Sequence, residues 1–219
     1  MSDNFNSIFV NSTLQILEKR CLTLLSEGYF ILKSEGNISV DWDENDISKK
    51  LIMSLKGNMK RMSWKIDIVP EYLLYNDDNL PAKEAPRIDF RFSCWMPTEW
   101  AYFAEAKILI ETDAVKTGRK TKISAKRLHK RYVETGIDNY VSGKYPSNGC
   151  LIGYILQGQK ENIINSLNKC LSNYKRNSEI LQEQSFGLQD FNACYLSTHK
   201  DFFLIKHLMF DFANQNHVL

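Results

Sequence analysis

The sequence has no long apolar run, and no stretch of it approaches the roughly 20 residues that a membrane-spanning helix needs. Its start, MSDNFNSIFVNSTLQ, has neither the basic region nor the small-residue cleavage site of a secretory signal peptide. From these two absences we expect a soluble protein of the cytoplasm that makes no contact with a membrane.

Cysteine and histidine are scarce and scattered. The five cysteines form no CxxC pair, so the sequence suggests neither a disulfide framework nor a zinc knuckle. The four histidines show no HxH or HExxH spacing, which disfavours a histidine zinc site. No GxxxxGK[ST] or GxGxxG follows a predicted strand, so the usual nucleotide-binding loops are excluded as well.

What is present is the composition of an ordinary globular protein, with 219 residues, 43% of them hydrophobic and 25% charged. This length suits one core, so we expect a single domain over residues 1–219. Apolar periodicity and turn residues predict four helices and six strands. The helices are expected at 11–33, 43–58, 121–134 and 160–176, and the strands at 63–69, 87–95, 102–110, 149–156, 191–197 and 202–210.

The order of these elements indicates the fold class. Three strands, a helix and a strand apolar enough to be buried on both faces are typical of an α/β protein, so we predict a mixed central sheet flanked by helices. The loop at 75–86, YNDDNLPAKEAP, is expected to be the most flexible stretch.

Charged residues interrupt two of the predicted strands, each on one face only. Because side chains alternate along a strand, Glu105 and Lys107 share one side of strand 102–110, and the opposite side is apolar. Asp89 likewise interrupts one face of strand 87–95. Such charges are costly on a half-buried strand unless they are paired or bind a metal. If the two strands pair as a hairpin, Asp89 comes beside Glu105 and Lys107.

Two carboxylates and one ammonium in a small volume are the groups that a metal-dependent phosphodiesterase needs. Asp89 and Glu105 supply hard oxygen ligands for Mg²⁺ or Mn²⁺, and the Ala106 carbonyl is a candidate third ligand. The ion would neutralise a phosphate and acidify a bound water. Lys107 would orient or help to deprotonate that water and stabilise the charge of the transition state.

A structural interpretation stays open beside the catalytic one. Glu105 and Lys107 form the only [DE]-x-K of the sequence, yet this pattern occurs about once by chance in a chain of this size. The alternative is a cross-strand salt bridge among charged residues of an exposed sheet face. That bridge would join Asp89, Arg91, Glu105 and Lys107.

The sequence P-R-I-D at 86–89, a turn, E-A-K at 105–107, a helix and a buried strand together resemble the core of the PD-(D/E)xK nuclease superfamily, the fold of many restriction endonucleases. The resemblance covers about residues 40–156. It departs from the family pattern in that Pro86 stands three residues before Asp89, where the motif often has the two adjacent. The resemblance implies a restriction-endonuclease-like core and catalysis by the three charged residues named above.

Members of this family frequently add an acidic ligand from a preceding helix. Glu44 and Asp46, in DENDISKK, are the candidates here, and Glu71 is a weaker one. Acids also suit the first turn of a helix, where they interact with the macrodipole, and we favour this interpretation for Glu44 and Asp46.

Basic residues are unevenly distributed. The chain has 28 Lys and Arg against 26 Asp and Glu, but segment 114–133 has eight basic residues and no acidic one. Helical spacing places four of them on one side of the predicted helix, where we expect them to contact phosphates. These four are Lys122, Lys126, Arg127 and Lys130. The alternative is a lysine-rich solvated helix without a ligand.

Together these features predict a metal-dependent nuclease with nucleic acid, most plainly DNA, as substrate. By analogy with the family, the chain could be a homodimer or one subunit of a larger restriction or phage-defence assembly. The second hypothesis, from a different class, is a catalytically inactive nuclease-like scaffold that binds nucleic acid or a protein partner.

Overall fold

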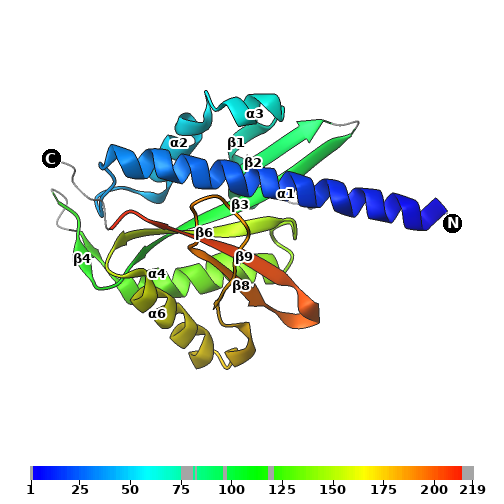
Figure 1. Ribbon diagram of the computed structural model, residues 1–219. Helices are drawn as coiled ribbons and strands as arrows, with labels where there is room; N and C mark the ends of the chain where they lie inside the picture. Colours follow the sequence, from blue (N-terminus) through cyan, green and yellow to red (C-terminus); the bar gives the residue numbers. More distant parts are fainter. Residues whose placement is uncertain (1, 75–80, 82, 96–97, 118–120, 214–219) are drawn as a thin grey trace.

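The computed structural model describes residues 2–74, 81, 83–95, 98–117 and 121–213. Its centre is a seven-stranded sheet with helices on both faces (Figure 1). In spatial order, the strands are β1 (Asp67–Leu73), β2 (Arg87–Trp95), β3 (Glu99–Ile110), β6 (Gly149–Gln157), β9 (Leu204–Asp211), β8 (Cys194–Thr198) and β7 (Gln182–Glu183). Strands β3, β6 and β9 are parallel, and the other neighbours are antiparallel. The predicted α/β class with a mixed central sheet is confirmed.

The remaining elements surround this sheet. The helices are α1 (Ser2–Glu35), α2 (Glu44–Leu55), α3 (Met59–Ser63), α4 (Ala125–Arg131), the π-helix η1 (Tyr132–Ile137), α5 (Asp138–Val141), α6 (Lys160–Asn173) and the short 3-10 turns η2 (Asn177–Glu179) and η3 (Lys200–Phe202). A separate two-stranded ribbon is formed by β4 (Ala114–Val115) and β5 (Lys122–Ile123).

Two apolar clusters pack against opposite faces of the sheet. One joins α1 and α2 to Ala104, Ala106 and Ile110 of β3, and the other joins η1 and α6 to Phe103 and Leu109 of the same strand. Burial of each large apolar side chain contributes about 1.5–3 kcal/mol. Side chains of β3 therefore alternate between two buried faces, as the sequence predicts, and the charged positions of β3 share the second face.

The motif strands lie as predicted. Strand β2 has the predicted bounds, 87–95, and pairs antiparallel with β1 on one side and β3 on the other. The pairing of β2 with β3 is the hairpin considered from the sequence. Strand β6 lies parallel to β3 and has eight consecutive buried residues from Gly149, so it is the doubly buried strand that its apolar run predicts.

The prediction of a strand at 63–69 is wrong for the first half of that range. Ser63 ends α3, and Lys65 takes a positive φ of 53° in the turn that follows, so β1 begins only at Asp67. The apolar alternation of Trp64, Ile66 and Ile68 resembles a strand, although Ile66 is buried between the turn and the start of β1. The first helix begins at Ser2 and not at residue 11.

The basic helix also differs from the prediction. It begins at Ala125, because residues 122–123 pair with β4, so Lys122 lies on a strand and not on the helix face assigned to it. The helix then widens into η1, where Gly136 packs so closely on β6 that a Cβ would lie 2.9 Å from a Leu151 methyl. Most of the loop predicted to be flexible, residues 75–80 and 82, lies outside the described residues.

Across the part of the chain that the structure describes, none of the helices has the length and apolar character needed to cross a membrane.

Candidate active site

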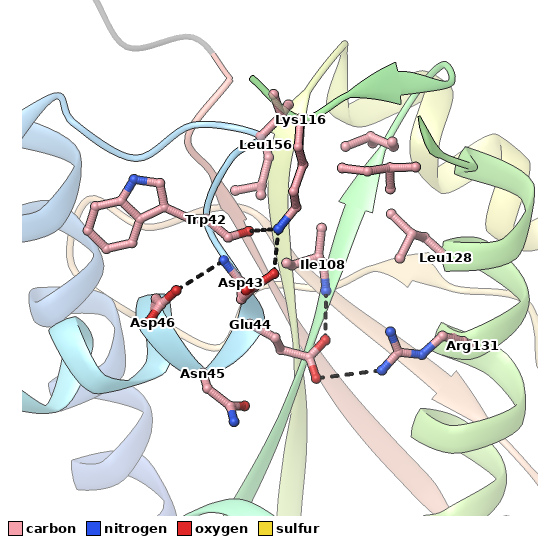
Figure 2. A pocket seen from close by; sticks show the side chains of 13 residues that line it. Trp42, Asp43, Glu44, Asn45, Asp46, Ile108, Lys116, Leu128, Arg131 and Leu156 are labelled. Carbon is pink, nitrogen blue, oxygen red and sulfur yellow. Dashed lines mark hydrogen bonds and ion pairs between the residues drawn. The ribbon is translucent and has the colours of Figure 1, made fainter. Parts of the chain in front are cut away.

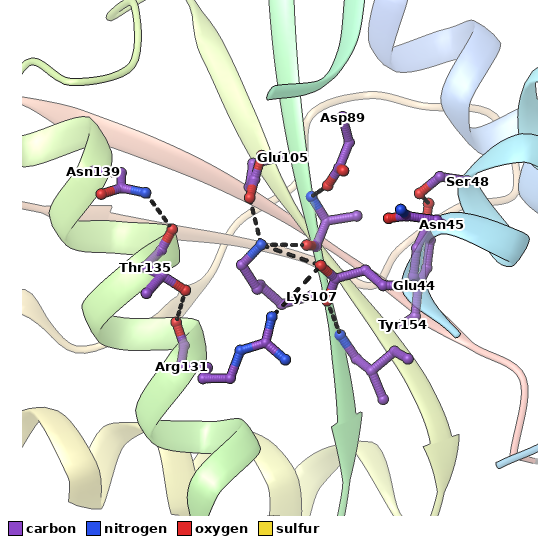
Figure 3. A network of polar contacts seen from close by, with 12 residues as sticks. Glu44, Asn45, Ser48, Asp89, Glu105, Lys107, Arg131, Thr135, Asn139 and Tyr154 are labelled. Carbon is purple, nitrogen blue, oxygen red and sulfur yellow. Dashed lines mark hydrogen bonds and ion pairs between the residues drawn. The ribbon is translucent and has the colours of Figure 1, made fainter. Parts of the chain in front are cut away.

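Strands β2 and β3 separate beside Asp89. Their regular pairing ends at Phe90 and Ala104. Further along β3, the main-chain N–H of Ala106 donates a hydrogen bond of 2.7 Å to Oδ2 of Asp89. The Asp89 side chain is thereby held against the main chain of β3, next to Glu105 and Lys107 (Figure 3). The structure thus brings together the three charged residues that the sequence singles out.

The Lys107 side chain turns back along β3 toward Glu105. Its Nζ donates to Oε1 of Glu105, to the Ala106 carbonyl at 2.8 Å and, over a longer distance of 3.4 Å, to Oε1 of Glu44. Glu105 and Lys107 are each only 5% exposed. The Lys107 ammonium is therefore enclosed by oxygen atoms in the way that a bound cation would be.

The second oxygen of Glu105 is in an unusual state. Oε2 is buried and accepts no hydrogen bond, and it is alone in this among the buried side-chain nitrogens and oxygens of the described residues. The Tyr145 hydroxyl is close enough to the Glu105 carboxylate to lower its pKa as a hydrogen-bond donor, but no hydrogen bond of normal distance and angle reaches Oε2. An unsatisfied buried acceptor costs about 1–3 kcal/mol, and more when charged. Oε2 is therefore suited to a ligand, and a cation is the ligand that carboxylate and carbonyl oxygens fit.

Glu44, the first residue of α2, reaches the same cluster from another element. Its Oε2 accepts a hydrogen bond of 3.2 Å from the main-chain N–H of Ile108, and its Oε1 lies 3.9 Å from the Arg131 guanidinium. The helix-start interpretation of Glu44 is therefore incomplete, because this side chain also connects α2 to β3 and to Lys107.

The other two acids considered from the sequence have different partners. Asp46 accepts a hydrogen bond of 3.4 Å from the main-chain N–H of Asp43, as the helix-start interpretation expects. Glu71 accepts a bond of 2.8 Å from the side-chain amide of Asn45. Of the three acids, Glu44 is the one that contacts Lys107.

Arg91 is not part of the cluster. Its guanidinium pairs with Glu99 at 2.6 Å and lies over the Tyr72 ring, 4.7 Å from the ring centroid. The alternative of an exposed salt bridge is therefore wrong in two respects, because Arg91 pairs elsewhere and Glu105 and Lys107 are buried. The Glu105–Lys107 ion pair that it expected is present.

Burial and like charge disfavour ionisation of the site carboxyls. Desolvation, and then the charge of Glu105, raise the pKa of Asp89 to about 8. Desolvation also raises the pKa of Glu105, although Lys107 opposes it. Desolvation alone would lower the pKa of Lys107, but the carboxylates of Glu105, Glu44 and Asp89 outweigh it and the pKa is raised. The ammonium therefore stays charged at neutral pH.

The donor set fits a divalent cation only with help from the main chain. No three side chains of His, Cys, Asp or Glu are placed to hold one ion among the residues described. Asp89 and Glu105 supply two carboxylates, and the Ala106 carbonyl between them adds a hard oxygen, which leaves the other positions of Mg²⁺ or Mn²⁺ to water and phosphate. The orphaned Oε2 of Glu105 supports this donor set.

The four predicted phosphate contacts lie on β5 and α4. Lys126 and Arg127 are exposed, whereas Lys122 and Lys130 lie 3.2 and 3.4 Å from acidic neighbours. The basic residue that reaches the cluster is Arg131, which is 48% exposed and was not among the predicted contacts. A helical wheel alone could not single out Arg131, because only the packing of α4 and η1 shows which side of the helix adjoins Glu44.

Two hollows border the cluster, one on each side of α2. A hollow of about 540 Å³ lies between the start of α2, β3, β5 and α4, and Glu44 lines it (Figure 2). A second, of about 390 Å³, lies between α2 and β1, and Asp89 lines it. Glu44 and Asp89 are therefore open to a ligand in these hollows, whereas Glu105 and Lys107 line neither of the two.

No model of a known protein family, no curated protein and no solved structure matches the chain. The assignment of a function therefore depends on the geometry of the cluster itself.

Proposed function

We propose that the chain is a metal-dependent nuclease of the PD-(D/E)xK type that cuts DNA. In this proposal Asp89, Glu105 and the Ala106 carbonyl hold Mg²⁺ or Mn²⁺, and Lys107 acts on the reacting phosphate. The observation that carries the proposal is Oε2 of Glu105, a buried carboxylate oxygen without a hydrogen-bond partner. It belongs to a cluster that also holds the Asp89 carboxyl and the Ala106 carbonyl.

The order of the central strands gives further support. The resemblance implies an antiparallel hairpin that carries the acid and the E-x-K, followed by a helix and a strand parallel to the second hairpin strand. Strands β2 and β3 pair antiparallel, and β6, after α4, lies parallel to β3. This arrangement agrees with a restriction-endonuclease-like core, which is part of the proposal.

When bound, the ion would supply a Lewis acid that neutralises phosphate charge and acidifies water. Lys107 contributes charge and not a free base, because its pKa is raised and its ammonium stays protonated. From beside Glu105 it can donate hydrogen bonds to a phosphate oxygen as negative charge builds there. Glu44, within 3.4 Å of Nζ, limits the directions that the ammonium can take. Glu44 is therefore a positioning residue for Lys107.

A non-catalytic scaffold is the second candidate, and one observation favours it. The Lys107 ammonium already neutralises Glu105 through a buried ion pair, which is what a purely structural cluster would show. The two candidates differ in one respect: only in the nuclease does Oε2 of Glu105 receive a cation.

Incubation with circular, linear and single-stranded DNA and with RNA, in Mg²⁺ or Mn²⁺, tests the proposal. The wild type should cut at least one of these substrates, and Glu105→Gln should not, because the amide removes a charged ligand and keeps the shape. Glu99→Gln is the matched control, since Glu99 lies on the same strand but pairs with Arg91. Cleavage by Glu105→Gln at the wild-type rate would overturn the assignment of the site.

A further inference from the structure

The larger hollow, of about 540 Å³, has an apolar floor, and its volume lies within the range of about 300–1,000 Å³ of small-ligand pockets. Its floor comes from four elements, β3, β5, α4 and β6. The floor residues are Ile108, Ile110, Ile123, Leu128 and Leu156. Ile108 and Ile123 are the partly exposed members of this floor, and their side chains can contact the flat face of an apolar group.

Charged residues stand at the two ends of this hollow (Figure 2). At one end Lys116 pairs with Asp43 and donates to the Trp42 carbonyl at 3.4 Å, which fixes that end. At the other end Arg131 faces Glu44 across 3.9 Å, with its side chain 48% exposed. Glu44 also contacts Lys107, so this second end adjoins the candidate active site.

We propose that the hollow binds one unpaired nucleotide of the nucleic-acid strand, with the base on the apolar floor and its phosphate on Arg131. This inference rests on the proposed function, because the strand must pass the Asp89–Glu105–Lys107 cluster. A nucleotide has an apolar face at one end and an anion at the other, and the hollow presents an apolar floor and the guanidinium of Arg131 in the same order. Arg131 lies 3.9 Å from Glu44 and must leave this acid to take the phosphate. Arg131 can match phosphate oxygens in a bidentate manner.

The substrate class follows from this geometry. A base inside a duplex is stacked and paired, and it must be unstacked at a cost of a few kcal/mol before it enters a pocket. In a single strand or at a frayed end, most of this free-energy cost is absent because the base is already unpaired. The nuclease is therefore expected to prefer unpaired nucleic acid over a closed duplex.

Binding of a short single strand, with and without its bases, tests the proposal directly. Fluorescence anisotropy in Ca²⁺, with the Lys107→Ala protein so that the strand stays intact, compares a normal oligonucleotide with an abasic one of the same length. The abasic strand keeps every phosphate, so only base contacts are removed. The abasic strand should bind about tenfold more weakly. This loss corresponds to the lower part of the free-energy range for the stacking of one base on a protein side chain.

Ile123→Trp, made in the same background, fills the hollow and should bind both strands equally. Val115→Trp is the matched control, because Val115 lies on the neighbouring strand of the same ribbon and is 59% exposed. It should keep the preference for the strand with bases. A 2-aminopurine base in the strand should change its fluorescence with the control and not with Ile123→Trp.

Equal affinity for both strands before the hollow is filled would overturn the nucleotide site, and so would a preference that survives in Ile123→Trp. Either result leaves the nuclease proposal intact if the wild type cuts nucleic acid in a manner that depends on Glu105. Absence of binding to both strands would also overturn the nucleotide site, and cleavage of duplex DNA by the wild type would then decide the nuclease proposal separately.

Discussion

The main-chain N–H of Ala106 donates its hydrogen bond to the Asp89 carboxyl, 2.7 Å away, at the point where β2 and β3 separate. Asp89 therefore secures the strand that carries Glu105 and Lys107, and it also lines a hollow of about 390 Å³ beside the site. One side chain thus has a structural and a proposed chemical role, and different substitutions separate the two.

Asp89→Ala removes the acceptor and should lower the free energy of unfolding by about 1–3 kcal/mol, because the Ala106 N–H loses its partner. Asp89→Asn keeps an oxygen acceptor at the same place and should lose less stability. Both should lose metal binding, since neither retains the carboxylate. Denaturant unfolding of the two variants measures the difference, and equal losses would show that the hydrogen bond to Ala106 does not secure β3.

The pKa of Asp89 predicts a pH-dependent metal affinity. Without a cation, a pKa of about 8 leaves Asp89 protonated at neutral pH, so a metal must displace the proton. Affinity for Mn²⁺ should rise up to about pH 8 and then level off. Calorimetry in buffers of different ionisation enthalpy should detect release of a proton at neutral pH. A constant affinity between about pH 6 and 8 would contradict the shift.

The same shift has a consequence for the metal-free protein. An Asp in an unfolded chain has a pKa of about 3.9. Because the pKa of Asp89 is higher in the folded state, the contribution of the protonated carboxyl to stability is complete only below that pH. The contribution is lost as pH rises toward about 8. Asp89→Asn, which has no proton to lose, should reduce this decline in the free energy of unfolding.

The basic helix and the site should respond differently to substitution. Replacing Lys126 and Lys130 together with Ala should weaken binding to DNA regardless of sequence and reduce the slope of log K against log salt by about 0.9 per lost contact on duplex. Since Lys130 lies 3.4 Å from Glu134, most of the change is expected from Lys126. Lys200→Ala, on the exposed turn η3, is the control. An unchanged slope would make the basic helix a solvated surface.

Lys107→Ala should have the opposite effect. Cleavage should be lost, whereas affinity for nucleic acid should stay within a few-fold, because the contribution of Lys107 is made mainly in the transition state. Binding isotherms and single-turnover cleavage of the same preparation measure both quantities. A large loss of affinity with residual cleavage would assign Lys107 to binding instead.

A buried histidine predicts the response to acid. The ring of His207 accepts or donates hydrogen bonds with Tyr132 at 2.9 Å and Ser197 at 2.8 Å, and burial lowers its pKa to about 3. A His in an unfolded chain has a pKa of about 6.5. The contribution of neutral His207 to the free energy of unfolding is therefore complete above that pH and is lost as the pH falls toward 3. His207→Gln should flatten the free energy of unfolding between about pH 6.5 and 5. Denaturation at several pH values measures this, and equal slopes would contradict it.

The motif strands could be predicted because their information is local. A period of two along β2 and β3 determines which face carries Asp89, Glu105 and Lys107, and neighbouring turns determine the strand ends. The first half of strand 63–69 could not be predicted, since apolar alternation continues through a turn in which Lys65 has a positive φ.

The contributions of Glu44 and Arg131 could not be predicted because they depend on packing between distant elements. Glu44 has the sequence context of an ordinary helix start, and only the approach of α2 to β3 brings it to Lys107. Arg131 is directed to the cluster by a helix that begins four residues later than its pattern suggests and widens into η1. The sequence predicts which groups form the site, but not which helices complete it.

Direct titration with Mn²⁺, followed by the electron paramagnetic resonance of the free ion, tests the central claim that Glu105 is a metal ligand. The wild type should bind Mn²⁺ at neutral pH, Glu99→Gln should bind it equally, and Glu105→Gln should lose about tenfold or more in affinity. Mn²⁺ binding that is the same in all three proteins would contradict the claim and make the Glu105–Lys107 pair a structural ion pair.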